Sequence, residues 1–346
     1  MRQFNEAERW WAIPPGPGNA ITDVAGVTVG HASLCAGTAR TGVTAIRPHG
    51  GDLFRLRPSA GLAVLNGFGK SAGLVQVAEL GEIETPILLT NTFGVAACAT
   101  ALIRAAIATN PEIGRSQPTV NPVVLECNDG QINDIQALAV SEDLARQALA
   151  NADARFAQGT VGAGTGMRSF GLAGGIGSAS RRVRLPGGSE FMLGALVLSN
   201  FGSPGELRVF GRRVGAPPQA APAEPDKGSI ILVFATDAPL DPRQLARLSR
   251  RAGAALGRLG SFIGHGSGDI ALAFSTAEMN DAEAAADTLS ARRLPERHMD
   301  AFFRAAVEAA EESVLNALWH AEPVEGYSGR RLPILRDLLR PGPTAG

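Results

Sequence analysis

Short apolar runs alternate with amphipathic stretches through the first half of the chain. Runs of apolar or alternating residues predict strands, and apolar positions three or four residues apart predict helices. Strands are expected at residues 26–32, 42–47, 61–66, 86–90 and 122–126, and helices at 70–80, 95–109 and 142–151. Ser141 followed by Glu142 and Asp143 is typical of an N-cap with acidic residues in the first helical turn.

The pattern changes after residue 160. Residues 160–210 are glycine-rich and β-like, which predicts antiparallel strands with bends. The stretch GAPPQAAPAEPDKG at 215–228 has no usable periodicity and predicts an exposed, flexible loop. The rest predicts a strand at 229–235, a helix from 241 to about 259, a strand at 269–275, and helices at about 281–290 and 296–321. This mixture predicts one α/β domain over residues 1–346, with helices covering sheet faces.

Glycine is the compositional anomaly, because the 42 glycines make up about 12% of the 346 residues against a typical ~7%. They have no collagen-like period and sit inside apolar segments. Glycine in such places permits tight turns and close approach of two backbones. We therefore expect closely packed layers instead of a disordered chain.

Charge and cysteine content narrow the class of protein. The net charge of −1 gives no general attraction to nucleic acid or to an anionic membrane. We find no signal peptide and no stretch of ~18 uncharged apolar residues to span a bilayer. Cys35, Cys98 and Cys127 are widely spaced, and we expect each to be a small buried residue in a reducing compartment. A soluble, cytoplasmic protein is expected.

The junction KGSI, residues 227–230, joins the polar loop to an apolar strand at a single Gly-Ser pair. For these four residues alone, a loop that ends in glycine before a strand that opens with serine is the simpler interpretation. Alternatively, the Ser229 hydroxyl attacks the Gly228 carbonyl, and hydrolysis of the resulting ester leaves Ser229 with a free α-amine. That amine has an unperturbed pKa of about 7.7–8.0, so one residue supplies both nucleophile and base.

Two other segments place polar groups beside apolar strands. The segment GHGSGD ends in Ser267 and Asp269, which share a face if the backbone is extended. A tight turn before a strand is the simpler interpretation. Asn200 ends the apolar run VLSN, where its amide suits either turn formation or donation to an oxyanion.

A further segment, ECNDGQ at 126–131, gathers carboxylates and amides at a strand end. Its acidic and amide side chains are candidate ligands for a substrate ammonium group, although for this segment alone an Asx-turn is the simpler interpretation. His265, beside Ser267, is a candidate substrate contact. No pair of histidines has the spacing of metal ligands on a helix, so we expect no metal and no cofactor.

Two glycine-rich stretches have partial anion-binding patterns. GAGTG at 162–166 lacks both the G-x-G-x-x-G spacing and the Lys-Ser/Thr ending of a phosphate loop, so we interpret it as a structural turn. Lys70 and Ser71 follow two glycines at an expected helix start, which could bind an anion. Without a longer motif we interpret that pair as packing.

Together these segments resemble the DmpA-type self-processing aminopeptidases, which include L-aminopeptidase/D-amino-acid esterase-amidases and β-peptidyl aminopeptidases. The resemblance runs from about residue 19 to about residue 276. Its blocks include NAITDVAGVTVGH, RTGVTAIRPHGG, NGFGKSAGL, ETPILLTNT, NPVVLECNDG, GAGTGM, GGIGSASR, GALVLSNFG, GSIILVFATDAPL and GSGDIALAFST. It implies a four-layer αββα sandwich of the DmpA and ornithine acetyltransferase type, autoproteolysis into fragments 1–228 and 229–346, and a homotetramer.

The resemblance also implies roles for residues at the matching positions. Gly228 carries the carbonyl that is attacked, and Ser229 is the nucleophile. Ser267 and Asp269 orient that nucleophile, and Asn200 stabilises the oxyanion. The remaining matches, which line the substrate site, are Glu126, Asn128 and Asp129.

One position departs from the family pattern. Gln131 stands where these aminopeptidases can carry a tyrosine whose hydroxyl reaches the nucleophile, and an amide donates hydrogen bonds without the acidity of a phenol. This leaves the preference for L-, D- or β-amino acids open.

The predicted function is therefore a serine aminopeptidase or amidase that releases N-terminal amino acids from short peptides, amides or esters. Three alternatives stay open. The first is an acyltransferase of the ornithine acetyltransferase type, in which a second amine accepts the acyl group. The second is an amidase for linear synthetic oligomers, and the third is an unprocessed, inactive scaffold.

Overall fold

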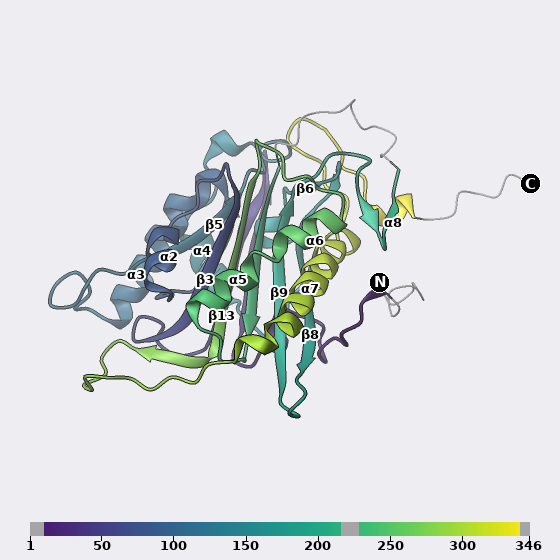
Figure 1. Ribbon diagram of the computed structural model, residues 1–346. Helices are drawn as coiled ribbons and strands as arrows, with labels where there is room; N and C mark the ends of the chain where they lie inside the picture. The colour runs from purple at the N-terminus through teal and green to yellow at the C-terminus, as the bar shows by residue number, and fades with distance from the viewer. Residues whose placement is uncertain (1–9, 216–227, 340–346) are drawn as a thin grey trace, which may run out of the picture.

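Two sheets lie face to face between two layers of helices in the computed structural model (Figure 1). The structure describes residues 10–215 and 228–339. Residues 216–227, which make up nearly all of the predicted flexible loop, lie outside the described residues. The layers follow the order helices, sheet, sheet, helices, which confirms the predicted αββα sandwich.

Sheet A has the strand order β1-β2-β4-β5, and sheet B has the order β3-β13-β12-β9-β8. The strands of sheet A are β1 (Thr28–Ala36), β2 (Ala39–Arg47), β4 (Ile87–Asn91) and β5 (Val123–Cys127). Those of sheet B are β3 (Leu56–Gly67), β8 (Gly175–Arg184), β9 (Glu190–Asn200), β12 (Ser229–Thr236) and β13 (Gly268–Asp281). Two small ribbons consist of β6 (Arg168–Ser169) with β7 (Leu172–Ala173), and β10 (Arg208–Val209) with β11 (Arg212–Arg213). All seven predicted strand segments lie within or overlap these strands.

Helices cover the outer face of each sheet (Figure 1). On the side of sheet A lie α3 (Val95–Thr109) and α4 (Glu142–Ala150), whereas α2 (Leu74–Leu80) packs against β3 at the edge of sheet B. On the side of sheet B lie α5 (Pro242–Ser249), α6 (Ala252–Arg258) and α7 (Met299–Trp319), with α8 (Leu335–Leu338) near the C-terminal end. Single 3-10 turns are η1 (Ile21–Asp23), η2 (Thr92–Gly94), η3 (Ile135–Ala137), η4 (Gly162–Gly164) and η5 (Glu296–His298). As predicted, Ser141 caps α4 by accepting the Leu144 N–H at 3.2 Å.

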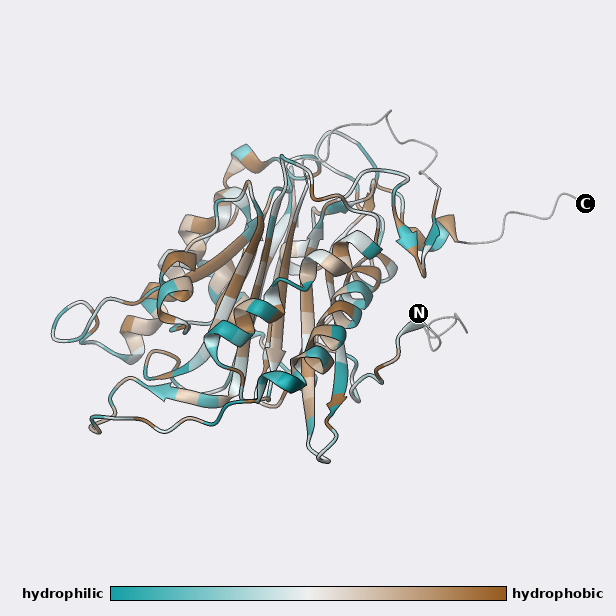
Figure 2. Cartoon of the chain, viewed as in Figure 1, coloured by the Kyte–Doolittle hydropathy of each residue, from teal (hydrophilic) through white to brown (hydrophobic). Residues whose placement is uncertain are grey.

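Strand β12 shows why its sequence is continuously apolar. Every residue in it is buried. Ile231 and Val233 face the core between the two sheets, whereas Leu232 and Phe234 face the core under the sheet B helices. Because both faces are covered, the strand needs apolar side chains at successive positions. Figure 2 shows the same apolar character along the central strands, with hydrophilic residues on the outer faces of the helices.

Glycine in β8 brings a helix close to the sheet. A Cβ at Gly177 would lie 2.8 Å from the Ala317 Cβ on α7, closer than two carbon atoms can pack. Glycine is therefore required where α7 crosses this strand. The glycine richness of the sequence corresponds here to close layers, as expected.

Three predictions of local structure are wrong. The expected helix at 70–80 begins only at Leu74, because Gly73 adopts a left-handed φ of 85°. The single helix expected from 241 to 259 is divided into α5 and α6. The expected helix at 281–290 does not form, because β13 pairs with β3 as far as Asp281 and the following residues are mostly exposed, with no apolar surface to cover.

The environment of the cysteines is also partly different from the prediction. Cys98 and Cys127 are buried, as expected, whereas Cys35 is exposed. Cys35 lies near the end of β1, an edge strand whose burial falls off toward Ala36. Burial raises the pKa of Cys98 to about 12 and raises that of Cys127 well above its usual range. Neither buried thiol is a nucleophile at neutral pH.

One segment, residues 92–109, is long and apolar enough to cross a membrane by length and composition alone, which was not expected from the sequence. In the structure this segment forms η2 and α3. Helix α3 buries Cys98, Ala101 and Leu102 in the core on the outer side of sheet A. Arg104, on the same helix, forms an ion pair of 2.9 Å with Glu142. A single helix of this kind is weak evidence for a membrane protein, since core helices have the same composition.

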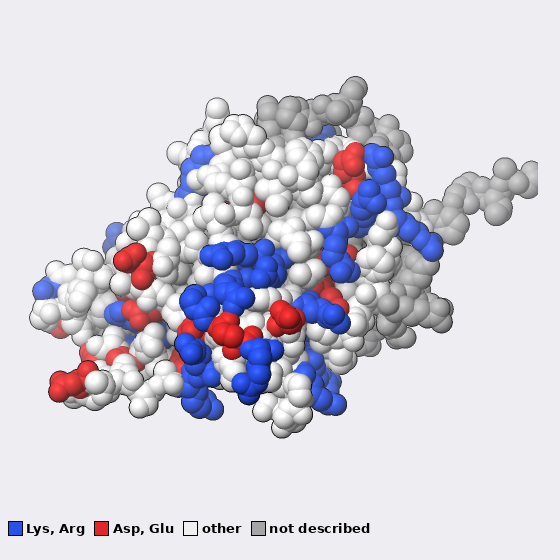
Figure 3. All heavy atoms as spheres, viewed as in Figure 1, with Lys and Arg blue, Asp and Glu red and all other residues white. Residues whose placement is uncertain are grey.

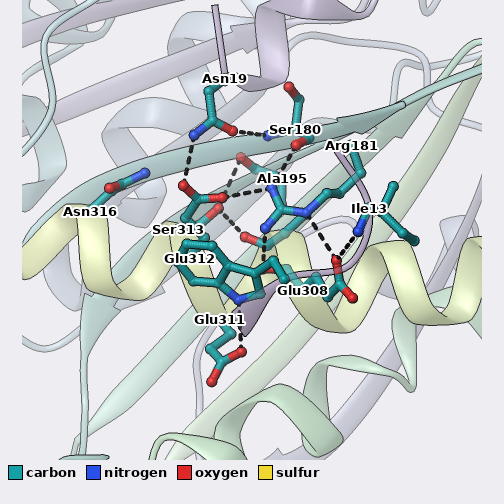
Figure 4. Close-up of polar contacts among 12 residues, drawn as sticks. Ile13, Asn19, Ser180, Arg181, Ala195, Glu308, Glu311, Glu312, Ser313 and Asn316 are labelled. Carbon is teal, nitrogen blue, oxygen red and sulfur yellow. Dashed lines mark hydrogen bonds and ion pairs between the residues drawn. The ribbon is translucent and has the colours of Figure 1, made fainter. Parts of the chain in front are cut away.

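The N-terminal strap, residues 10–19, is held by carboxylates of α7 (Figure 4). Trp10 and Trp11 donate their indole N–H groups to Glu311 at 3.0 Å, and the Asn19 amide donates to Glu312 at 2.8 Å. Arg181 of β8, only 1% exposed, pairs with Glu312 at 2.6 Å and with Glu308 at 3.3 Å. These bonds join the chain before residue 228 to the chain after residue 229.

On the outer face of sheet B, charged side chains gather over α5 and the start of α7 (Figure 3). Arg243 and Arg247 both pair with Glu296, and Arg293 lies 3.6 Å from Asp241. These ion pairs share two carboxylates, and basic side chains outnumber acidic ones over this face (Figure 3).

Candidate active site

Ser229 is the first residue of β12, the central strand of sheet B. Opposite it lie Asn200 on the antiparallel strand β9 and Gly268 on the parallel strand β13. Its hydroxyl oxygen accepts the Gly268 N–H at 3.1 Å, and the residue is 5% exposed. Strand pairing thus brings together three residues that are far apart in the sequence.

Gly228 approaches β9 so closely that no side chain fits there. A Cβ at this position would lie 2.5 Å from the Phe201 Cα and closer still to the Asn200 carbonyl oxygen. Only glycine allows the peptide bond before Ser229 to take this position. Packing therefore requires the glycine of the Gly-Ser pair, and the serine supplies the hydroxyl that the chemistry needs.

Ser267 and Asp269 form a buried pair on either side of Gly268. The Ser267 hydroxyl donates to Asp269 Oδ1 at 2.6 Å, and both residues are 1% exposed. The backbone N–H of Gly268 donates a hydrogen bond to the Ser229 hydroxyl, so the residues on either side of Gly268 lie next to the candidate nucleophile. Asp269 accordingly supplies a fixed carboxylate in a site largely removed from water.

Asn66, at the end of β3, holds the turn that carries this pair. Its amide nitrogen donates to the carbonyl oxygens of His265 at 3.0 Å and Gly264 at 3.2 Å, and also to that of Ser267. Asn66 was not predicted as a site residue, although it belongs to the block NGFGKSAGL. An asparagine between an apolar strand and a glycine was the available signal.

The side chain of Asn200 has a fixed orientation. Its Oδ1 accepts the Arg168 N–H at 2.8 Å, and its Nδ2 donates to the Asn128 carbonyl oxygen at 3.0 Å. An amide nitrogen carries two hydrogens, so the second can donate to an oxyanion that forms beside Ser229. This position agrees with the role that the resemblance implies.

A cleft of about 370 Å³ opens beside Ser229. Besides Ser229, its walls are formed by Phe68, Lys70, Thr92, Glu126, Asn128, His265 and Gly266. Three of the five residues predicted to contact substrate, namely Glu126, Asn128 and His265, therefore lie in this cleft. Phe68 and Thr92 were not predicted from the sequence, and Lys70 was interpreted as packing.

Glu126, at the end of β5, is a preorganised carboxylate. It is 3% exposed, and its Oε1 accepts the Lys70 backbone N–H at 2.7 Å. Its Oε2 accepts the Thr92 hydroxyl hydrogen. A carboxylate has further acceptor capacity beyond these two bonds, so Glu126 can also bind a substrate ammonium group.

Asp129 and Gln131 lie outside the walls of the cleft. Asp129 is 1% exposed, and burial raises its pKa to about 6, although Thr41, Asn133 and Asn91 bond to it. Asn133 donates to it at 3.0 Å and Asn91 at 3.2 Å. These contacts hold the turn after β5, so the geometry favours a structural role for Asp129 over the predicted contact with substrate.

Gln131 is exposed, and its side-chain oxygen accepts from Arg168 Nη1 at 2.6 Å. The backbone N–H of Arg168 also donates to the side chain of Asn200. Gln131 is therefore linked to Asn200, the candidate oxyanion donor, through Arg168. Arg168 is another residue that was not predicted from the sequence.

The remaining histidine, cysteine and acidic side chains were considered as possible metal ligands. Within residues 10–215 and 228–339, no three His, Cys, Asp or Glu side chains are grouped to hold a metal ion. Desolvation lowers the pKa of His31 to about 4, and this ring bonds Thr44 at 2.9 Å and the Ala157 carbonyl at 3.0 Å. His31 is therefore a neutral structural residue.

Known proteins are similar to this chain in both sequence and architecture. Residues 19–332 match the family model described as Peptidase family S58. A Sphingosinicella microcystinivorans protein named β-peptidyl aminopeptidase BapA is 39% identical over 361 residues, covering 95% of this chain and 90% of the relative.

Two solved structures have the same fold. A β-aminopeptidase from Burkholderia sp. superimposes with a TM-score of 0.85 at 40% identity, covering 95% of both chains. The L-aminopeptidase D-Ala-esterase/amidase of Ochrobactrum anthropi, described as a prototype of the serine aminopeptidases and a variant of the Ntn hydrolase fold, has a TM-score of 0.87 at 35% identity. It covers 95% of this chain and 96% of its own.

Proposed function

The chain belongs to peptidase family S58 and is a serine hydrolase of the aminopeptidase class with the Ntn fold, and we propose that Ser229 is its nucleophile, exposed by cleavage of the Gly228–Ser229 bond. The resemblance seen in the sequence is thereby confirmed at the level of family and fold. The observation that carries the assignment of Ser229 is its position on β12. There its hydroxyl meets the Gly268 N–H beside Asn200 and the cleft.

Self-cleavage begins with the uncut chain. The Ser229 oxygen attacks the Gly228 carbonyl carbon, and the hydroxyl proton passes to the Ser229 nitrogen as the C–N bond breaks. The ester that forms is then hydrolysed by water. The products are a carboxylate at Gly228, and a free hydroxyl and α-amine at Ser229, which yields fragments 1–228 and 229–346 of the single domain.

The mature site hydrolyses substrate by the same chemistry. The α-amine of Ser229 accepts the hydroxyl proton, and the oxygen attacks the substrate carbonyl carbon. The resulting ammonium group passes this proton to the leaving amine or alcohol as the scissile bond breaks, which forms the acyl-enzyme. Water then hydrolyses the ester, which releases the amino acid and restores the Ser229 hydroxyl. Asn200 donates to the oxyanion, while Ser267 and Asp269 orient the nucleophile. No cofactor has a part in this scheme.

Glu126 supports the assignment of an aminopeptidase over an endopeptidase. A buried carboxylate in the wall of the cleft suits the free ammonium group of an N-terminal residue. We propose that the enzyme releases N-terminal amino acids from short peptides, amides or esters, in keeping with the names of its relatives. Asn128 and His265 contribute the adjoining walls.

Assembly and location are further parts of the proposal. We propose a homotetramer on the basis of the family resemblance, and the exposure of Val75, Phe262 and Leu138 in the single chain (86%, 70% and 65%) leaves apolar surface that subunit contacts would cover. We also propose a cytoplasmic location, in keeping with three free cysteines. Light scattering of the purified protein tests the assembly, and fractionation of the source cells tests the location.

Intact mass spectrometry of freshly purified protein tests the mechanism. We expect two fragments, the second beginning at Ser229, whereas Ser229→Ala should remain one inactive chain. Ser189→Ala, an exposed serine on the turn between β8 and β9, is the matched control and should be cut and active. An uncut yet active wild-type enzyme would contradict the α-amine as base. Transfer of the acyl group to an added amine, with no hydrolysis, would favour the acyltransferase.

A further inference from the structure

Lys70 lies in the cleft beside Ser229 but has no part in the proposed reaction. After β3 ends, the Gly69 N–H donates to the Gly67 carbonyl at 2.8 Å, and the chain turns toward the cleft. The Lys70 backbone N–H then donates to Glu126 at 2.7 Å. The backbone of Lys70 is therefore fixed against the carboxylate that we assign to the substrate amine.

The Lys70 ammonium group lies over an exposed aromatic ring. Its Nζ is 4.2 Å from the centroid of the Phe68 ring, and Phe68 is itself 57% exposed. Among the described residues, no carboxylate forms an ion pair with Lys70 within 4.0 Å. A ring face holds a cation in place but offers no oxygen to its three N–H donors, so the group can still bind an anion.

The cleft thus contains one fixed anion and one cation. Glu126 is buried and suits an ammonium group, whereas Lys70 is exposed on the same cleft wall and suits a carboxylate. A volume of about 370 Å³ accommodates a small amino-acid derivative with both charges. The arrangement is complementary to a substrate that carries both an amine and a carboxylate. The carboxylate can be on the side chain of the N-terminal residue or beyond the scissile bond.

We propose that Lys70 is a specificity-determining residue that selects substrates with a carboxylate. The carboxylate is located either on the side chain of the N-terminal residue or on the C-terminal residue of a dipeptide. This inference rests on the proposed function, because it names the substrate class of the same site. The interpretation of Lys70 as packing is replaced by binding of an organic anion.

Two pairs of substrates distinguish the two positions of the carboxylate. The 4-nitroanilides of aspartic acid and asparagine differ only in the acyl side chain, and alanylglycine and alanylglycinamide differ only at the C-terminus. We expect wild-type kcat/KM to favour the charged member of one pair. Lys70→Met should reduce that preference about tenfold, the low end of what a hydrogen bond between charged groups contributes, and Lys70→Glu should reverse it.

The matched control is Arg184→Met, which removes one positive charge from an exposed side chain of β8 that pairs with Glu190. It should keep the wild-type preference, because only a charge in the cleft contacts the substrate. Equal kcat/KM within both pairs in the wild type, or an unchanged preference in Lys70→Met, overturns the inference.

Binding separates this inference from the proposed function. Calorimetric titration of Ser229→Ala with aspartic acid α-amide, asparagine α-amide, alanylglycine and alanylglycinamide measures the preference without turnover, because the α-amides differ only in the side-chain carboxylate. Absence of hydrolysis by the wild type would contradict the proposed function. Absence of any preference for a carboxylate in these titrations would contradict the role of Lys70 whether or not the wild type is active.

Discussion

The Ser267 hydroxyl donates a 2.6 Å hydrogen bond to Asp269 Oδ1, with Gly268 between them bonded to the Ser229 hydroxyl. Ser267 and Asp269 are both buried, and a hydrogen bond is electrostatically stronger in such a site than in water. The Asp269 carboxylate therefore polarises the Ser267 hydroxyl strongly. The pair is not among the residues that form the walls of the cleft, so the role proposed for it is to orient groups around Ser229 and not to contact substrate.

Asp269→Asn should preserve the shape of this pair and remove its charge. We expect kcat to fall by about 100-fold, the lower range for a group that assists proton transfer, while KM changes little. Steady-state kinetics on a 4-nitroanilide measures both. Ser275→Ala is the control, since Ser275 is also buried in β13 but bonds the Ala238 carbonyl at 2.7 Å, away from the site. An unchanged kcat in Asp269→Asn would exclude a role for its charge.

Gly228→Ala should slow self-cleavage. A Cβ there meets the backbone of Asn200 and Phe201, so the peptide bond before Ser229 must move. A displacement of about 1 Å at a reacting group lowers rates by about 100-fold. Mass spectrometry of the uncut fraction over time after cell-free synthesis measures the rate. Gly187→Ala, where a Cβ meets nothing within 4 Å, should be cut at the wild-type rate, and equal rates in both variants would contradict the prediction.

Asp129 should make stability fall as the pH rises between about 4 and 6. Its folded-state pKa of about 6 exceeds the ordinary value of 3.8, so the folded chain binds this proton more tightly than the unfolded chain. The stabilisation is complete below the lower value and is lost as the pH rises through about 6. The difference between about 6 and 3.8 corresponds to about 3 kcal/mol.

Urea unfolding of Ser229→Ala with and without Asp129→Asn, at pH values from 4 to 7, tests this dependence. Both proteins should stay uncut, so one chain unfolds in each case. The free energy of unfolding of the chain that keeps Asp129 should decrease, relative to that of the chain with Asp129→Asn, as the pH rises. A constant difference across this range would show that the carboxyl group titrates normally.

Arg181→Met should destabilise the fold by about 3–5 kcal/mol, because it leaves the carboxylates of Glu308 and Glu312 without their buried partner. The contacts of this cluster are drawn in Figure 4. Arg184→Met, three residues away on β8, breaks an exposed pair with Glu190 and should change stability by less than about 1 kcal/mol. Urea unfolding of both variants on the Ser229→Ala background measures the contrast, and similar losses would contradict it.

Local sequence determined much of the secondary structure. The helix at 95–109 has the predicted ends, and α4 begins at the predicted cap. Asp241 forms a capping box with Gln244 at the start of α5. These features depend on neighbours within four residues, which a linear pattern contains.

Predictions from local sequence were wrong where tertiary contacts decide the structure. The alanine-rich segment at 281–290 favours a helix by propensity, yet it has no apolar surface to cover. Likewise, the burial of Asp129 depends on contacts with Thr41 of β2 and Asn91 of β4, and the position of Lys70 in the cleft depends on its bond to Glu126 at the end of β5. Residue type alone does not contain that relationship.

The sequence by itself determined the family, the strands and the residues at the Gly228–Ser229 junction. Only the tertiary structure decided that Asn200, Ser229 and Gly268 lie side by side, because β12 inserts between β9 and β13. Each of these segments alone had a simpler interpretation as a turn. Pairing of strands distant in sequence is a long-range interaction, and it brings three separate segments together into one site.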